Sequence, residues 1–294
     1  MMKVNVGVSK GRRIGAHLSI ASGLDKAVES IVEKGGNCLQ IFSGSPRGWQ
    51  MRLPSQAEAK SFRDLCKKKD VRPVFIHAKY LINLGSDKSK LVEISKQSLI
   101  HDLRVAEMIG AKGVIVHLGS HQGRGWQSVK QQLARGINDI LRATPKPTEL
   151  MIENSAGQKG KIASQLKEIR FLFQAVRSMR LSWCLDSCHA WAAGYSLGKV
   201  RQLLIQNDIV EEAERLRILD RLGCVHVNDS RDEFGCGRDR HENLGKGKLG
   251  LEGLKKYVNH PKLKHLPMII ETPGFGGLGP DKRNLEILKS LVME

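Results

Sequence analysis

The chain has 294 residues, long enough to bury a large core, and its formal net charge is +18 at pH 7. Its longest apolar stretches are only strand-sized, and its basic N-terminus has no apolar segment long enough for a secretory signal. These features argue against a membrane or secreted protein and predict a soluble, cytoplasmic one whose positive surplus attracts polyanions such as nucleic acids; a solvated basic surface without a specific partner is the alternative that charge alone leaves open.

Short apolar runs alternate with helical patterns along the whole chain. The predicted strands are 12–19, 37–43, 71–78, 112–118, 148–153, 181–187, 223–228 and 266–271. The predicted helices are 23–34, 55–69, 87–110, 126–143, 160–179, a longer helical region over 197–222, a short helix after an irregular loop at 229–250, and a last helix at 281–293. This alternation, without a break in composition, predicts a single-domain α/β fold, a (β/α)8 TIM barrel over residues 12–294, preceded by a basic N-terminal tail at residues 1–11.

Six of the predicted strands end on a histidine or a carboxylate. These residues are His77, His117, Glu153, Asp186, His226 and Glu271, separated by 40, 36, 33, 40 and 45 residues, about one strand plus one crossover helix each. Active sites of TIM barrels lie at the carboxyl ends of the strands, so we expect the six side chains to converge there. His17 ends the first strand in the same way and is interpreted either as a direct ligand or as a residue of the pocket floor.

Three further donors follow two of these strands. His189 comes three residues after Asp186, where the strand is predicted to pass into a loop, and Asp239 and His241 lie two apart on one side of an extended segment. Nine donors are too many for one zinc ion but suit two or three ions, with zinc expected and manganese or iron as alternatives. Paired metals stabilise the attacking and leaving oxygens of phosphoryl transfer. Together with the basic charge, the donors therefore favour hydrolysis of a phosphodiester.

The cysteines indicate neither a zinc finger nor a disulfide framework, because the chain has no CxxC pair and is too large to need covalent staples. Cys184 and Cys224 each precede a predicted ligand by two positions, so in a strand they point the same way, one layer deeper. The residues at the same offset on the other strands are apolar: Phe75, Ile115, Met151 and Ile269. Core packing is therefore the prediction for Cys184 and Cys224.

Six segments form a specific set of motifs that runs from about residue 13 to the C-terminus. They are Ile14–Ser19 (IGAHLS), His117–Ser120 (HLGS), Ile152–Gln158 (IENSAGQ), Leu185–Tyr195 (LDSCHAWAAGY), His226–Ser230 (HVNDS) and Asp239–His241 (DRH). Together they resemble the endonuclease IV family of abasic-site endonucleases. The resemblance implies a TIM barrel that holds three zinc ions and acts on abasic sites in duplex DNA.

The resemblance also implies which residues act together. It places one zinc ion on His77, His117 and Glu153, with Glu153 bridging to a second ion on Asp186, His226 and Glu271, and a third ion on His189, Asp239 and His241. Glu153 and Glu271 are the residues expected to be catalytic. Arg47, Tyr80 and Leu81 fall on the loops that enter the DNA in this family and hold the duplex open at the lesion.

The implied activity is hydrolysis of the phosphodiester 5′ to an abasic site, leaving a 3′-hydroxyl and a 5′-deoxyribose phosphate. The resemblance also implies removal of 3′-blocking groups and 3′-to-5′ exonuclease activity. A sugar isomerase or epimerase on a related barrel is one alternative, although it needs only one or two metals and no surplus of positive charge. A metal-stabilised DNA-binding protein without catalysis is another. Nothing in the sequence requires more than a monomer.

Overall fold

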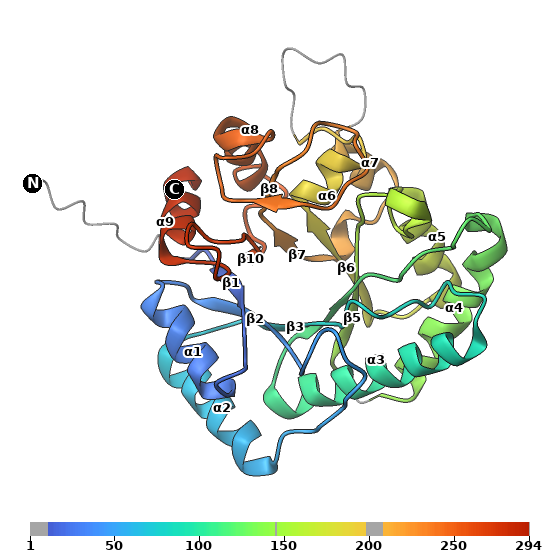
Figure 1. The fold of residues 1–294 in the computed structure, drawn as a ribbon, viewed down its shortest axis with the longest axis horizontal. Coiled ribbons are helices and arrows are strands. Elements are labelled where there is room, and N and C mark those ends of the chain that lie inside the picture. Colours follow the sequence, from blue (N-terminus) through green and yellow to red (C-terminus); the bar gives the residue numbers. More distant parts are fainter. Residues whose placement is uncertain (1–10, 145, 198–207, 294) are drawn as a thin grey trace, which may run out of the picture.

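Eight parallel strands form a closed barrel in the computed structural model, which describes residues 11–144, 146–197 and 208–293 (Figure 1). The strands are β1 (Ile14–Leu18), β2 (Cys38–Phe42), β3 (Val74–His77), β4 (Gly113–Val116), β5 (Glu149–Glu153), β6 (Leu181–Asp186), β7 (Leu222–His226) and β10 (Met268–Ile270). Strand β10 pairs with both β7 and β1 and so closes the ring. The predicted single-domain TIM barrel is confirmed. Residues 1–10 of the predicted basic tail lie outside the described residues.

Helices surround the barrel (Figure 1). They are α1 (Leu24–Glu33), α2 (Gln56–Lys69), α3 (Ser89–Ile109), α4 (Trp126–Arg142), α5 (Leu166–Val176), α6 (Ser187–Ala192), α7 (Ile209–Arg215), α8 (Gly250–Val258) and α9 (Lys282–Leu291), with short 3-10 helices at Gln158–Gly160 and Leu219–Arg221. Much of the helical region predicted at 197–222 lies outside the described residues. Among the helices that the structure describes, none is long and apolar enough to cross a membrane.

The helices form where capping and amphipathic spacing agree. The hydroxyl of Ser55 accepts the backbone N–H of Glu58 at the start of α2, and the Glu58 carboxylate accepts the N–H of Ser55, so two otherwise unpaired donors are satisfied. In α4 the buried residues recur every three or four positions, which turns one apolar face toward the strands. These residues include Val129, Leu133, Ile137 and Ile140.

Three local predictions were wrong. His189 lies on the short helix α6, not in a loop, because the carboxylate of Asp186 accepts its backbone N–H and caps the helix. The helix predicted from residue 160 begins at Leu166, since Gly160 and Ala163 have positive φ angles of 70° and 68°, which a right-handed helix cannot contain. The irregular loop at 229–250 contains an antiparallel pair, β8 (Asp229–Ser230) and β9 (His241–Glu242).

A separate apolar cluster fills the barrel interior one layer below the strand ends. Its members are Cys38, Phe75, Ile115, Met151, Cys184, Cys224 and Ile269, all fully buried. Burial raises the pKa of the Cys184 thiol well above its ordinary value, which keeps it neutral. The core-packing prediction for Cys184 and Cys224 is therefore confirmed, while Cys66 and Cys236 are partly exposed.

Gly15 is the place where β1 meets this cluster without a side chain. A Cβ atom there would lie 1.8 Å from the backbone oxygen of Cys38 on β2. We expect Gly15→Ala to force β1 and β2 apart, lowering the free energy of unfolding by about 3 kcal/mol and the melting temperature by roughly 10 °C. Thermal unfolding measures this. Gly136→Ala is the control, because an added methyl group on α4 meets no described atom within 4 Å apart from the neighbouring residues and backbone of its own helix. Equal melting of the Gly15 variant and the unmodified protein would contradict the expectation.

Candidate metal centre

A cavity of about 1080 Å³ opens at the carboxyl ends of the strands and brings the predicted donors together. Six of the nine line it directly: His77, His117, His189, Asp239, His241 and Glu271. The other three, Glu153, Asp186 and His226, are fully buried just beneath. Strand ends β3 to β7, the residue after β10, helix α6 and the β8–β9 loop each contribute at least one donor. The structure brings all nine together, and their role as ligands remains a prediction.

Glu153, at the end of β5, is the centre of the donor cluster. Its Oε2 atom lies 3.1 Å from Nε2 of His77 and 3.3 Å from Nε2 of His117. Its Oε1 atom lies 3.1 Å from Nδ1 of His226 and 3.2 Å from Nδ1 of His189. The two carboxylate oxygens thus face different groups of imidazoles, as a bridging carboxylate must.

Two further groups of donors flank Glu153. Nδ1 of His226 lies 3.2 Å from Oε2 of Glu271 and 3.7 Å from Oδ2 of Asp186. In the other group, Oδ1 of Asp239 lies 3.0 Å from Nε2 of His189 and 3.5 Å from Nε2 of His241. His241 also lies 3.7 Å from Asp186, and His117, His189 and Asp239 form an overlapping group, so the third set is contiguous with the other two.

These separations fit metal coordination as well as hydrogen bonding. Two ligand atoms about 2.0–2.1 Å from one tetrahedral zinc ion lie roughly 3.3 Å apart, within the range found here. Nε2 of His189 and of His241 are buried without a hydrogen-bond partner in the described structure, although a carboxylate oxygen is near each. Buried polar nitrogens of this kind are costly unless a cation or proton satisfies them. The donor set and its spacing therefore fit several zinc ions.

His77 and His189 each have one ring nitrogen beside a backbone carbonyl oxygen. Nδ1 of His77 lies 2.7 Å from the backbone oxygen of Ala78, and Nδ1 of His189 lies 3.0 Å from that of Asn154. Because a carbonyl only accepts, the nitrogen beside it carries the proton and the nitrogen facing the cavity keeps its lone pair. This is the arrangement that metal-binding histidines show in proteins.

The pKa values of the Glu153 carboxyl and the His226 imidazole indicate that the buried carboxylates of the site attract positive charge. Burial would raise the pKa of the Glu153 carboxyl, but the charges of His117 and His226 and hydrogen bonds from His189 and His226 hold it well below its usual range. Burial would lower the pKa of His226, but the carboxylates of Glu271 and Glu153 raise it well above its usual value. Burial does lower the pKa of His117 to about 4. Without metal, imidazolium protons thus neutralise the buried carboxylates.

The loop that carries Asp239 and His241 is organised by one buried acid. The side chain of Asp229 accepts backbone N–H groups along the loop and into α8. The donors are Ser230, Gly245, Gly247, Leu249 and Gly250. This holds the irregular segment in one shape without regular secondary structure, so that Asp239 and His241 reach the strand ends.

The three residues predicted to contact DNA lie on loops beside the cavity. Tyr80 is 62% exposed, lines the cavity, and has its ring 6.0 Å from that of His77. Its backbone N–H donates to Pro46 at 3.3 Å, which joins its loop to the loop of Arg47. Arg47 is exposed and Leu81 is partly buried. The structure places them near the opening; their contact with DNA stays a prediction.

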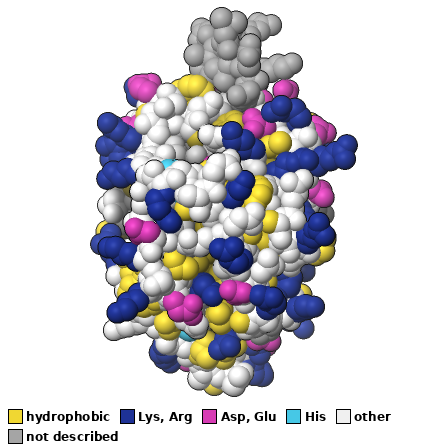
Figure 2. All heavy atoms as spheres, turned by 90° about the vertical axis from the view of Figure 1, so that its right-hand side faces the viewer, with side chains coloured by type: hydrophobic (Ala, Val, Ile, Leu, Met, Phe, Trp, Pro, Cys, Tyr) yellow, Lys and Arg dark blue, Asp and Glu magenta, His cyan; other side chains and the backbone are white. Residues whose placement is uncertain are grey.

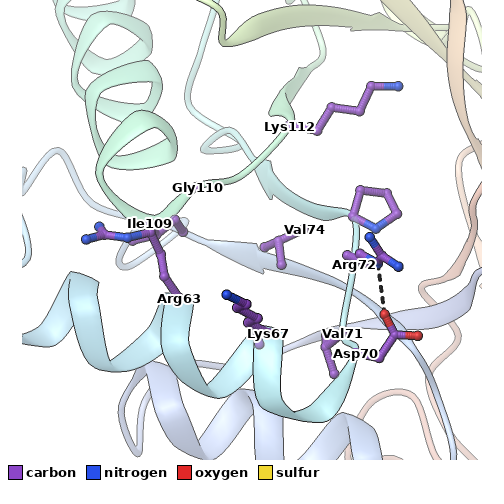
Figure 3. Close-up of a pocket in the computed structure, with 11 residues that line it drawn as sticks. Arg63, Lys67, Asp70, Val71, Arg72, Val74, Ile109, Gly110 and Lys112 are labelled. Carbon is purple, nitrogen blue, oxygen red and sulfur yellow. Dashed lines mark hydrogen bonds and ion pairs between the residues drawn. The ribbon is translucent and has the colours of Figure 1, made fainter.

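Another cavity, of about 520 Å³, lies at the opposite end of the barrel, between the ends of α2 and α3 and the starts of β3 and β4 (Figure 3). Figure 3 shows the pairing of Arg72 with Asp70, whose atoms are 2.8 Å apart. Among the described residues that line this cavity, Asp70 is the single carboxylate and none is a histidine. Its chemistry is unsuited to a metal cluster, so this cavity is not a candidate metal centre.

Sequence reasoning missed three side chains that hold the donors. Gln40 on β2 contacts two of them and is fully buried. The amide of Asn228 donates to Oδ2 of Asp186 at 2.6 Å, and Asn154 accepts the backbone N–H of Asp186, also at 2.6 Å. A signal for Gln40 existed, because it follows Cys38 by two positions just as the donors follow the other cluster members. His17, with Nδ1 2.9 Å from Glu271, lies at the pocket floor.

A closed parallel barrel with this cluster at its carboxyl ends defines the class of metal-binding TIM-barrel proteins. A family model described as a xylose isomerase-like TIM barrel matches residues 28–291. A protein of Halothermothrix orenii named probable endonuclease 4 is 36% identical over 278 residues, which are 94% of this chain and 99% of that protein. The chain belongs to the endonuclease IV family.

Solved structures agree with this assignment. Endonuclease IV from Thermus thermophilus superposes with a TM-score of 0.83 at 36% identity, covering 95% of this chain and 98% of that one. A D-tagatose 3-epimerase-like protein superposes with a TM-score of 0.69 but is 17% identical, covering 94% of this chain and 96% of that one. The second likeness shows the shared barrel fold alone.

Proposed function

We propose that this protein is a DNA-repair endonuclease that hydrolyses the phosphodiester 5′ to abasic sites in duplex DNA, leaving a 3′-hydroxyl and a 5′-deoxyribose phosphate. The observation that carries the proposal is the convergence of nine imidazole and carboxylate donors in one cavity of an endonuclease IV family member. Removal of 3′-blocking groups and 3′-to-5′ exonuclease activity are further activities of the same centre. The protein acts as a monomer in the cytoplasm, and residues 12–294 form the catalytic domain.

The proposed cofactor is three zinc ions, with manganese or iron as substitutes. One ion takes His77, His117 and Glu153; the second takes Glu153, Asp186, His226 and Glu271; the third takes His189, Asp239 and His241. When bound, such ions activate water and stabilise the charge on the attacking and leaving oxygens. Glu153 and Glu271, the proposed catalytic residues, supply the negative charge that gathers the ions. No side-chain nucleophile is needed.

The surface supports a polyanionic substrate. Figure 2 shows Lys and Arg side chains spread over the visible face, with fewer acidic ones between them. The net charge of +18 attracts phosphates without selecting a sequence. Specificity then comes from the loops that carry Arg47, Tyr80 and Leu81, which insert where the missing base leaves the duplex easy to deform.

Tyr80 provides a test of this role. Loss of its ring removes one stacking surface, worth about 1–2 kcal/mol, so we expect Tyr80→Ala to weaken binding of an abasic duplex by roughly tenfold with the zinc content unchanged. Fluorescence anisotropy measures the binding. Met179→Ala is the control, because Met179 is also exposed, at 81%, but precedes β6 at the other end of the barrel. Equal binding by both variants would contradict the assignment.

The activity itself is tested with a labelled duplex that contains one tetrahydrofuran abasic analogue. This analogue cannot undergo β-elimination, so any cut is hydrolytic. We expect incision only on the 5′ side of the lesion, with a 3′-hydroxyl product, and none in an intact duplex. Zinc-loaded protein that binds this duplex without cutting it would favour a DNA-binding protein without catalysis. Protein that neither binds nor cuts DNA but interconverts a ketose would favour a sugar epimerase.

A further inference from the structure

Gln40 is a fully buried amide between two of the candidate ligands. It projects from β2, in register with His17 on the neighbouring strand. Its Oε1 atom lies 2.8 Å from Nε2 of His226, and its Nε2 atom donates to Oε1 of Glu271 at 2.6 Å. A single side chain therefore touches two residues of the group that we assign to one ion.

These two contacts fix the orientation of the amide. The reverse orientation would place the amide oxygen against the Glu271 carboxylate, two acceptors together, so the nitrogen faces Glu271 and the oxygen faces His226. The amide oxygen only accepts; the neutral imidazole of His226 thus carries its proton on Nε2. Its Nδ1 keeps the lone pair, and Nδ1 is the atom that faces Glu271, Asp186 and Glu153.

The same amide also orients Glu271. Oε1 of Glu271 accepts from Gln40 and lies 2.9 Å from Nδ1 of His17. Oε2 is the oxygen left facing His226, at 3.2 Å from Nδ1. One carboxylate oxygen is thus anchored to β1 and β2, while the other is presented to the centre of the cluster.

His226 differs in this respect from three of the other candidate histidine ligands. His77, His189 and His241 place their outward ring nitrogens near backbone oxygens, those of Ala78, Asn154 and Glu271. A backbone oxygen cannot be removed by substitution, but the partner of His226 is a side chain. The proton position of one ligand therefore depends on a single replaceable residue.

We propose that Gln40 is a positioning residue for the ion held by Asp186, His226 and Glu271. It keeps His226 in the tautomer that can bind metal and turns Glu271 so that Oε2 faces the ion. The inference rests on the proposed metal-dependent function. Gln40 hydrogen-bonds the proposed ligands of one ion only. Its loss should therefore weaken the binding of that ion and leave the binding of the other two unchanged.

The test is zinc release from loaded protein under a series of chelators of increasing affinity. Gln40→Met keeps the length and approximate volume of the side chain but removes its hydrogen bonds with His226 and Glu271, together with the contact of the amide nitrogen with Nδ1 of His17 at 3.0 Å. Gln40→Asn keeps the amide but is one methylene too short to reach both ligands. We expect both variants to release one zinc ion at an affinity about 10–100-fold below that of the unmodified protein, with kcat for abasic-duplex cleavage lowered by a similar factor and KM unchanged.

Gln132→Met is the matched control, since the Gln132 amide likewise takes part in two hydrogen bonds, donating to the backbone oxygens of Leu84 and Ser86, away from the cluster. It should release zinc as the unmodified protein does. The proposal would be overturned if both Gln40 variants released zinc as the unmodified protein does, or if all three ions were bound equally more weakly. The proposal would also be overturned if Gln40→Asn released zinc normally while Gln40→Met bound it weakly. A polar side chain would then be enough to hold the ion, without hydrogen bonds to both ligands.

The two proposals fail in different ways. If the unmodified protein binds zinc but does not cut the abasic duplex, the proposed activity is wrong while the zinc-release comparison still tests Gln40. If Gln40→Met does not fold, Gln40→Asn carries the same comparison.

Discussion

Glu153→Gln is expected to lower kcat for cleavage of an abasic duplex by at least about 10³-fold, more than the loss of one oxyanion-stabilising donor usually costs. The substitution preserves shape but removes the charge of a side chain that lies within 3.3 Å of four imidazoles. A neutral amide has one oxygen and cannot bridge two cations. DNA binding should change by no more than about threefold, because it depends on surface charge and the exposed loops.

Single-turnover cleavage and anisotropy on the same duplex separate these two effects. Glu149→Gln is the control: Glu149 begins the same strand, and its carboxylate accepts the hydroxyl of Ser182 at the other end of the barrel. This variant should cut at the unmodified rate. Cleavage by Glu153→Gln within tenfold of that rate would show that Glu153 does not bridge the metals.

Removal of metal is expected to lower the melting temperature by roughly 10 °C at pH 8.5 and by less at pH 6. Free zinc a thousandfold above its dissociation constant adds about 4 kcal/mol to the free energy of unfolding. The pH dependence follows from His189 and His226. Burial would lower their pKa values, but the surrounding carboxylates raise both well above the ordinary value.

A raised folded-state pKa contributes stability that is complete below the unfolded value of about 6.5 and is lost as pH rises through the folded value. The depressed pKa values of Glu153 and Glu271 act in the opposite direction: their contribution is present above about 4.3 and is lost as the solution becomes more acid. The contribution of His189, His226, Glu153 and Glu271 is therefore fully present between about pH 4.3 and 6.5, while the lowered pKa of His117 acts against stability as pH falls below about 6.5.

Loaded protein behaves differently, because zinc needs neutral imidazoles and so binds more tightly as pH rises. Calorimetry of loaded and stripped samples from pH 6 to 8.5 measures the growing difference. Zinc added back to stripped protein serves as the control for irreversible damage. Identical melting of both samples at pH 8.5 would mean that the cluster does not bind metal in the folded protein.

Much of the donor set could be predicted because strand ends obey a simple rule. An apolar run that ends on His or Glu, repeated at one-unit spacing, places each donor at the same end of the barrel, so His77 and Glu271 could be brought together although 194 residues separate them. The core packing of Cys184 and Cys224 could be predicted in the same way, because residues two apart on a strand point to the same side.

The other features of the fold and the site could not be predicted, because they depend on contacts that leave no repeating pattern in the sequence. Residues Ser187–Ala192 form a helix because Asp186 caps it through a local hydrogen bond, a second role for a residue that also counts as a donor. Two-residue strands such as β8 and β9 are too short to show alternation. Gln40 could not be predicted as a site residue, because an amide is not a usual zinc ligand. Its proposed role is to orient His226 and Glu271.

The closed ring of strands has a consequence for the order of events during synthesis. The donors are spread from β3 to the residue after β10, and Glu271 is the last to leave the ribosome. No nascent chain that stops before Glu271 can present the full set, and β10 must insert between β7 and β1 before that carboxylate reaches its partners. If the nine donors hold metal as proposed, complete loading would report that the ring has closed, and partly made chains could not carry the assembled set of donors.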